Sequence, residues 1–152
     1  MQKINTFLWF DGNAEEAVNF YTSIFKDSKL GNVMHWPDKP GQVLTVSFEI
    51  MGSEFTALNG GPQYKFTEAV SFLVPCETQE DVDYYHDKLG AGGEILPCGW
   101  LKDKFGVAWQ VTPSILLKMM SDPDRVKANR VMQIMMTMKK LEIAPLVKAY
   151  EG

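Results

Sequence analysis

The sequence predicts an α+β fold built from two similar βαβββ units and a helical tail. Strand-like, helix-like and again strand-like segments follow one another twice in the same order, as in an internal repeat. When the two copies are superposed, Glu16 falls on Glu80 and Val18 falls on Val82. Each unit alone would leave open sheet edges, so we expect the two to pair within a single domain. The first unit is expected at about residues 1–62, the second at about 66–113 and the tail at 114–152.

Length and composition are those of an ordinary globular protein. Hydrophobic residues make up 45% of the 152 residues, the formal net charge is −4 and the isoelectric point is near 5.2. An acidic chain is repelled by phosphate backbones, so we expect no nucleic-acid partner. The start does not resemble a signal peptide, and no apolar stretch approaches the roughly 20 residues that cross a bilayer. We therefore expect a cytoplasmic protein with no membrane partner.

The first unit begins with a strand expected at residues 3–10, which is rich in aromatic and branched side chains and ends at Asp11-Gly12. Asn13 and Glu16 have the spacing of a helix N-cap and its partner. The helix that follows carries one apolar stripe, as expected for a helix lying on a sheet. Its members are Ala14, Ala17, Val18, Tyr21, Ile24 and Phe25.

The remainder of the first unit has a period of two, which is typical of strands. Leu44, Val46, Phe48 and Ile50 alternate with polar residues and mark a strand with one buried face. The other elements are strands at 33–36 and 55–58, a loop at 37–41 and a closing turn at 59–62.

The second unit starts with a strand at residues 69–74, followed by Thr78 and Asp81 at capping-box spacing. Face alternation in the last strand predicts that Trp109 packs in the core and lies opposite in face to Gln110. Pro113 closes that strand, because proline cannot donate a hydrogen bond to a ladder. The remaining elements are a helix ending at Gly90 and short strands at 92–97, 100–104 and 107–111.

The tail is expected to form three helices, at 115–120, from Asp122-Pro123 onward and at 141–150. The middle helix has more apolar residues than one stripe can hold, and six of the nine methionines lie in the tail. These side chains either cover the sheet of their own chain or associate with a second copy; we expect a homodimer that the tail helps to hold. The excess residues are Val131, Met132, Ile134, Met135, Met136 and Met138.

Three segments closely resemble the PhnB-like proteins, often labelled 3-demethylubiquinone-9 3-methyltransferase domains, of the vicinal oxygen chelate superfamily. They are LWFDGNAEEAVNFYTSIF at 8–25, DKFGVAWQVTP at 103–113 and the tail at 121–152. The resemblance implies a glyoxalase/bleomycin-resistance-like fold, in which paired βαβββ modules wrap a U-shaped sheet around a cavity. It also implies that any metal ligands come from the first and last strands of each unit.

Metal chemistry at that usual site is not expected here. Residues 4–10 and 69–74 contain no His, Asp, Glu or Cys, and Gln110 stands where the resemblance implies Glu. We therefore expect no cofactor. The alternative is a metal-dependent glyoxalase- or dioxygenase-type enzyme with non-standard ligands, such as His35, Glu49 or Glu54. A methyl donor would need a glycine-rich turn between a strand and a helix, and no glycine pair of this chain has that context.

Of the reactive side chains, Cys76 and Cys98 are expected to be reduced structural thiols, and His86 a solvated residue of the second helix. The preferred function is binding of a small organic molecule in an aromatic-lined cavity, as the bleomycin-resistance branch does without metal. Whether the chain catalyses a reaction is left open, and a vestigial cavity with an associating tail is a third possibility. The predicted ligand-binding residues are Thr6, Leu8, Phe10, His35, Phe48, Asn59, Phe72, Trp100 and Gln110.

Overall fold

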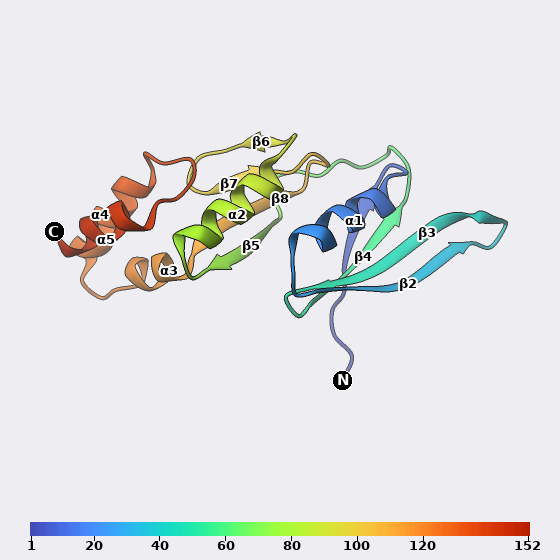
Figure 1. Ribbon diagram of the computed structural model, residues 1–152, viewed down its shortest axis with the longest axis horizontal. Coiled ribbons are helices and arrows are strands. Elements are labelled where there is room, and N and C mark those ends of the chain that lie inside the picture. Colours follow the sequence, from blue (N-terminus) through green and yellow to red (C-terminus); the bar gives the residue numbers. More distant parts are fainter. The chain divides into compact units, whose positions relative to one another are not determined.

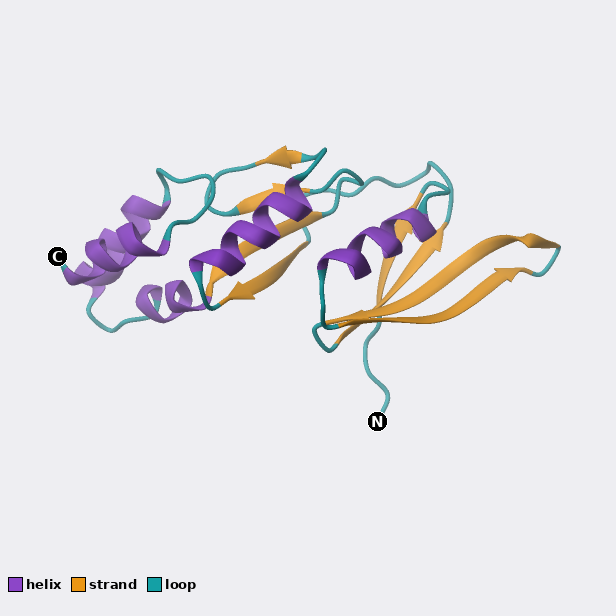
Figure 2. Ribbon diagram, viewed as in Figure 1, coloured by secondary structure: helices purple, strands orange, loops and turns teal.

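The computed structural model describes residues 1–152 and separates into two compact units, Met1–Phe66 and Thr67–Gly152. Each unit contains a four-stranded mixed sheet with a helix against one face (Figures 1 and 2). The strand orders are β1-β4-β3-β2 and β5-β8-β7-β6, so the two sheets share one topology. In both, the first and last strands of the unit pair in parallel. The predicted α+β fold with two βαβββ modules and a helical extension is confirmed.

The first unit runs through β1 (Thr6–Phe10), α1 (Ala14–Ile24), β2 (Ser28–Trp36), β3 (Lys39–Ile50) and β4 (Ser53–Asn59). The predicted loop at 37–41 is too long, because Trp36 already pairs with Lys39 across a two-residue turn. The polar and glycine-containing parts of β2 and β3 lack the apolar alternation that marks a strand in the sequence. Their hairpin is therefore longer than the sequence pattern indicates.

The N-terminus of α1 is capped from a distant part of the chain. Asn13 is the N-cap residue, as predicted, but its side chain makes no capping hydrogen bond. Instead, Asn59 Oδ1 accepts a hydrogen bond from Ala14 N at 2.9 Å. The same carboxamide donates from Nδ2 to Val43 O at 3.1 Å, so Asn59 joins α1, β3 and the end of β4. A cap of this kind satisfies one of the free N–H groups of the first helical turn.

The face of the first sheet against α1 forms the core of this unit. Tyr21 of α1 stacks on Phe48 with 6.0 Å between ring centroids, and Phe48 stacks on Phe55 at 5.3 Å. The buried strand residues alternate along each strand, as expected for a sheet with one covered face. They are Leu8, Phe10, Val46, Phe48, Ile50, Phe55 and Ala57.

The second unit contains β5 (Ser71–Cys76), α2 (Gln79–Gly90), β6 (Glu94–Ile95), β7 (Trp100–Lys102) and β8 (Ala108–Pro113). The predicted capping box is confirmed, since Thr78 and Asp81 exchange hydrogen bonds between side chain and backbone in both directions. Trp109 is 3% exposed and belongs to the core, while Gln110 is half-buried on the opposite face, as predicted.

The tail contains α3 (Ser114–Met120), α4 (Arg125–Met135) and α5 (Ile143–Glu151). The predicted start of α4 at Asp122 is two residues too early. Asp124 is the N-cap, and its carboxylate accepts hydrogen bonds from Val126 N at 3.1 Å and Lys127 N at 3.3 Å. Arg130 of α4 links the two helices by donating hydrogen bonds to the carbonyl groups of Ala149 and Tyr150 near the end of α5.

The tail has a hydrophobic cluster of its own, which takes up most of the apolar residues that the sequence left unassigned. Val131 is fully buried in it, and Ile134, Met135 and Met138 pack against it. Met132 and Met136 stay 37% and 65% exposed. The excess apolar surface on α4 is thus smaller than the sequence indicates. The buried members of the tail cluster are Leu116, Met119, Val131, Leu141 and Leu146.

The connection between α4 and α5 fastens the tail to the second sheet. Met138 O and Lys139 O accept hydrogen bonds from the backbone of Cys98 and Gly99 at 2.9 and 2.7 Å. Leu141 is 1% exposed and packs on Gly99, where an added Cβ would lie 2.8 Å from a Leu141 methyl carbon. Gly99 has a φ of +81°, so both its conformation and its neighbour require glycine.

One residue of α2, His86, is more deeply buried than the sequence indicates. The prediction that His86 is a solvated surface residue is wrong, because the side chain is only 6% exposed. The adjacent Asp87 and Lys88 are exposed and made the position look like a polar surface.

No helix of the structure combines the length and the apolar character that crossing a lipid bilayer requires.

Candidate functional site

The face of the first sheet that α1 leaves uncovered carries rows of polar side chains. Alternation along β3 places Ser47 and Glu49 on this open face, since Phe48 between them packs under α1. Their direct partners on β4 are Thr56 and Glu54. Neighbouring side chains on one sheet face lie close enough to act together. The open face therefore presents hydroxyl and carboxylate groups side by side.

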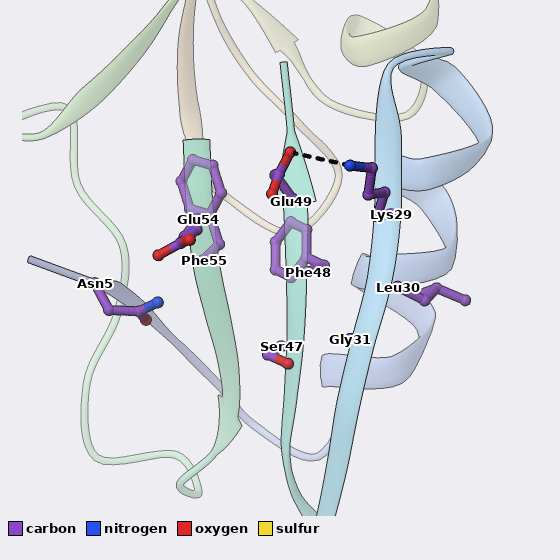
Figure 3. Close-up of a pocket in the computed structure, with 9 residues that line it drawn as sticks. All are labelled: Asn5, Lys29, Leu30, Gly31, Ser47, Phe48, Glu49, Glu54 and Phe55. Atoms are coloured by element: carbon purple, nitrogen blue, oxygen red, sulfur yellow. Dashed lines mark ion pairs between the residues drawn. The ribbon is translucent and has the colours of Figure 1, made fainter. Parts of the chain in front are cut away.

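A pocket of about 390 Å³ lies at this part of the first sheet (Figure 3). Its residues come from the segment before β1 and from β2, β3 and β4. A volume of this order accommodates a small organic molecule. The lining residues are Asn5, Lys29, Leu30, Gly31, Ser47, Phe48, Glu49, Glu54 and Phe55.

Two glutamates occupy paired positions on the strands that form the pocket. Glu49 and Glu54 are direct partners in the β3–β4 pairing. Lys29, the partner of Glu49 on β2, brings its Nζ to 4.0 Å from Glu49 Oε1 (Figure 3). Like charges directly opposite one another destabilise a sheet, and one exposed lysine offsets only part of that repulsion. A cationic or hydrogen-bond-donating group beside either carboxylate would reduce it.

The hydroxyl row is held by local hydrogen bonds and by a bulge in β2. Thr56 Oγ1 donates to Asn5 Oδ1 at 2.7 Å, and Ser47 Oγ accepts from Asn32 N at 2.7 Å. The pairing register shifts between Leu30 and Val33. At Gly31 an added Cβ would lie 2.3 Å from Ser47 Oγ, so glycine keeps this wall of the pocket bare. Bulges of this kind often lie beside binding sites and redirect side chains.

Aromatic side chains border the polar rows, and sequence reasoning missed them. Phe7 pairs with Thr56 on the open face and is 60% exposed. Trp9 donates from Nε1 to Gly61 O at 2.8 Å, and Tyr64 meets its ring edge-on with centroids 4.9 Å apart. Alternation along β1 could have identified Phe7 and Trp9, given the correct choice of buried face.

The residues predicted to form cavity walls in the first unit lie mainly on the other face. Leu8 and Phe10 are 5% and 2% exposed and belong to the core beneath α1. Phe48 contributes to the pocket lining, but it is 3% exposed and its ring stacks on Tyr21. The physical reason is that a helix covers the more apolar face of a sheet, whereas the sequence prediction assigned that face to the ligand.

The polar residues predicted in the first unit are spread over several places. Thr6 is half-buried at the start of β1, and His35 is exposed on the hairpin, paired with Val43. The Asn59 carboxamide is hydrogen-bonded to α1 and β3, as described above. It also lines a second pocket, of about 500 Å³, between the β1–α1 turn and the hairpin. The structure does not bring these three side chains together.

The second pocket is a poor fit for the methyl donor that a methyltransferase requires. It contains the strand-to-helix turn at Asp11-Gly12, but that turn has a single glycine and the Asn59 side chain occupies the first helical N–H. Asp11 and Glu15 add two carboxylates at the helix N-terminus. Gly60-Gly61 packs against Trp9 and does not precede a helix. The glycine-rich turn expected for a nucleotide-type donor is therefore not formed by these residues.

In the second unit, the structure brings Trp100 and Gln110 together. They are direct partners in the β7–β8 pairing, and Leu73 of β5 is the partner of Gln110 on its other side. Gln110 Nε2 donates to Ser71 Oγ at 2.8 Å, which orients the carboxamide. Phe72 instead packs beside Trp109, with ring centroids 5.5 Å apart. An indole and a fixed carboxamide thus share the open face of this sheet.

The donor atoms do not form the metal site that the sequence resemblance implies. The structure contains no group of three or more His, Cys, Asp or Glu side chains placed to hold a metal ion. His35 pairs with Val43, whereas Glu49 pairs with Glu54, so the alternative ligand set is not assembled. Cys76 at the end of β5 is 1% exposed, and burial raises the pKa of its thiol to about 12. A thiol held protonated is a poor metal ligand.

Comparison with known proteins relates the chain to one family. The model of the family described as 3-demethylubiquinone-9 3-methyltransferase matches residues 2–112. The PhnB protein from Bacillus cereus is 40% identical, with a TM-score of 0.67 over 74% of this chain and 99% of that one. The match ends before the tail, although the sequence resemblance was expected to include it. No curated protein matches.

Two further solved structures share the fold at lower identity. Protein PA1353 from Pseudomonas aeruginosa is 18% identical, with a TM-score of 0.61 over 74% of this chain and 98% of that one. The fosfomycin resistance protein FosX from Listeria monocytogenes is also 18% identical, with a TM-score of 0.52 over 74% and 93%. The chain belongs to the 3-demethylubiquinone-9 3-methyltransferase (PhnB-like) family.

Proposed function

We propose that this protein binds a small organic molecule on the open face of its first sheet, in the pocket of about 390 Å³. The observation that carries the proposal is the pairing of Glu49 with Glu54 at that pocket, next to the bare backbone of Gly31. The exposed ring of Phe7 lies on the same face, beside Thr56. Small-molecule sites typically combine such apolar surface with a few placed polar groups.

The polar groups favour a ligand with a cationic or strongly hydrogen-bond-donating end. Both carboxylates accept hydrogen bonds, and only Glu49 has a cationic neighbour within ion-pair distance. Asn5 accepts from Thr56 and leaves its own amide N–H groups for a ligand acceptor. We further propose that Trp100 and Gln110 form a second contact region, in which the carboxamide held by Ser71 orients a group stacked on the indole.

We propose that binding uses these side chains directly rather than a divalent metal. The support is the donor set, since the pocket contributes two carboxylates and no imidazole or thiol. The alternative is a metal-dependent enzyme that recruits Glu49, Glu54 and His35 after a rearrangement. Elemental analysis of the purified protein separates the two. Stoichiometric zinc, nickel, iron or manganese would favour the metalloenzyme and overturn our preference.

A thermal-shift screen of metabolites and antibiotics tests ligand binding. A ligand at 100 times its Kd should stabilise the fold by about 2.7 kcal/mol. Glu54→Gln should reduce that stabilisation for any compound with a cationic end. Glu80→Gln is the matched control, because Glu80 is exposed on α2 of the other unit. A hit that both variants bind as well as the natural sequence would place the site elsewhere.

A further inference from the structure

His86 lies buried on α2 with an unsatisfied ring nitrogen. Its side chain is 6% exposed, and Nε2 has no hydrogen-bond partner. Its other nitrogen, Nδ1, is 3.9 Å from Asp87 Oδ1, which is too long for a hydrogen bond. Buried polar atoms are satisfied in the great majority of cases, so this exception requires an explanation.

The same carboxylate oxygen is held by a cation from the tail. Lys140 Nζ lies 2.9 Å from Asp87 Oδ1 and 3.5 Å from Asp83 Oδ1. Lys140 Nζ and His86 Nδ1 therefore lie 2.9 and 3.9 Å from the same oxygen atom. While the imidazole is neutral, the lysine can occupy that oxygen without repulsion from the ring.

Lys140 sits within the segment that fastens the tail to the second unit. On one side of it, Met138 O and Lys139 O bind the backbone N–H groups of Cys98 and Gly99. On the other side, Gln79 donates to Leu141 O at 3.1 Å and accepts from Ile143 N at 2.8 Å. Gln79 also donates to Asp83 Oδ1 at 3.1 Å. The Asp83 carboxylate therefore contacts both Gln79 and Lys140.

We propose that His86 and Lys140 form a proton-operated latch, in which a proton on His86 loosens the segment at residues 138–143. An imidazolium carries an N–H group on both nitrogens, and the buried Nε2 has no acceptor to receive one. The protonated ring must then move toward Asp87 or toward water. At Asp87 it meets the Lys140 ammonium, which already contacts that carboxylate. Because Gly99 N–H is part of the fastening and Trp100 follows it, opening also frees the start of β7.

The charges around the ring define the direction of the pH effect. Burial, followed by repulsion from Lys140, holds the pKa of His86 below its ordinary value of 6.5, while Asp87 and Asp83 act in the opposite sense. The closed form thus binds fewer protons than the open form, so closure is fully present above about pH 6.5 and is lost as the pH falls below it. The charged groups that act on this ring are thus Lys140 of the α4–α5 connection and Asp83 and Asp87 of α2.

Hydrogen exchange at three amides measures the latch directly. The N–H groups of Cys98, Gly99 and Ile143 make the fastening hydrogen bonds. Between about pH 7.5 and pH 5, their protection factors should fall by up to about tenfold per pH unit, the limit for one proton. Amides of β3 and β4 in the first unit should keep theirs. Equal changes at all these amides would overturn the latch.

The chain offers a matched control, since it has only two histidines. His86→Phe should abolish the acid-induced loss of protection, and His35→Phe should leave it unchanged, because His35 is exposed in the other unit. If His86→Phe does not fold, Lys140→Met gives an independent readout. Without the lysine, the NMR titration of the His86 ring should move to higher pH. An unchanged titration, or an acid response that survives in His86→Phe, would refute the proposal.

Discussion

Asp103 Oδ2 accepts a hydrogen bond from Trp109 Nε1 at 2.9 Å, inside the core of the second unit. The other carboxylate oxygen accepts from Phe105 N at 2.9 Å and Val107 N at 3.0 Å. Asp103 is 3% exposed, so this carboxylate depends on its hydrogen bonds rather than on water. It therefore shapes the turn before β8 and fixes the indole that packs beneath α2.

We predict that Asp103→Asn destabilises the protein by about 1–3 kcal/mol, because it turns an amide donor toward the Trp109 N–H group. Trp109→Phe should also be destabilising, since it leaves Oδ2 without its donor. The two changes together should cost less than their sum, because each removes the same hydrogen bond. A double-mutant cycle in urea measures the coupling. Strictly additive losses would show that the hydrogen bond contributes nothing to stability.

The sequence could predict this strand but not its supporting carboxylate. Charge next to glycine at residues 103–106 has the appearance of an exposed turn, and burial of Asp103 depends on contacts formed only in the folded unit. The same limit explains two other errors. Asn59 caps a helix 45 residues away in sequence, and His86 is buried although its neighbours Asp87 and Lys88 are exposed. Local signals such as the Thr78–Asp81 capping box were predicted correctly.

The predicted cavity walls of the first unit differ in position from the open face for a different reason. Alternation along β1 separates Phe7 and Trp9 from Leu8 and Phe10, but it does not say which set a helix covers. The face had to be chosen from the side chains alone, and the more apolar set was assigned to the ligand. In the second unit, the partnership of Trp100 and Gln110 follows from register, which two short strands do not define in sequence.

The long-range cap on α1 leads to a second prediction. Asn59→Ala should cost about 1–3 kcal/mol, since it removes the acceptor for Ala14 N and the donor for Val43 O. Asn13→Ala should stay within about 0.5 kcal/mol, because Asn13 makes no side-chain cap. Urea midpoints of the two variants decide between the long-range and the local cap. A larger loss for Asn13→Ala would restore the local capping pair.

The two thiols should differ in reactivity. Cys76 is 1% exposed, and burial raises its pKa to about 12, so its reactive thiolate form is suppressed at neutral pH. Cys98 is partly exposed in the turn before β7. A thiol-specific reagent should modify one group per native chain and two in denaturant. Cys98→Ser should remove the native reaction, whereas Cys76→Ser should keep it; a fast reaction of both would contradict the burial of Cys76.

The last prediction concerns homodimer formation. The exposed apolar surface of the tail is smaller in the structure than the sequence indicated. Met136 and Val126 of the tail are 65% and 67% exposed, and we expect a homodimer in which this surface is covered. Removing the whole tail is a poor test, because Leu141 belongs to the tail core and packs on Gly99. Met136→Glu should instead produce a monomer at micromolar concentration in light scattering, with little loss of stability.

Met34→Glu is the matched control for that experiment, because Met34 is 60% exposed on β2 of the first unit. It introduces the same charge at a similarly exposed methionine, and the dimer should persist. A dimer that Met34→Glu disrupts and Met136→Glu does not would move the interface to the edge of the first sheet, where β2 has no further strand beside it. A monomeric natural sequence would contradict association through either surface. The two substitutions therefore test the existence of the dimer and the place of its interface separately.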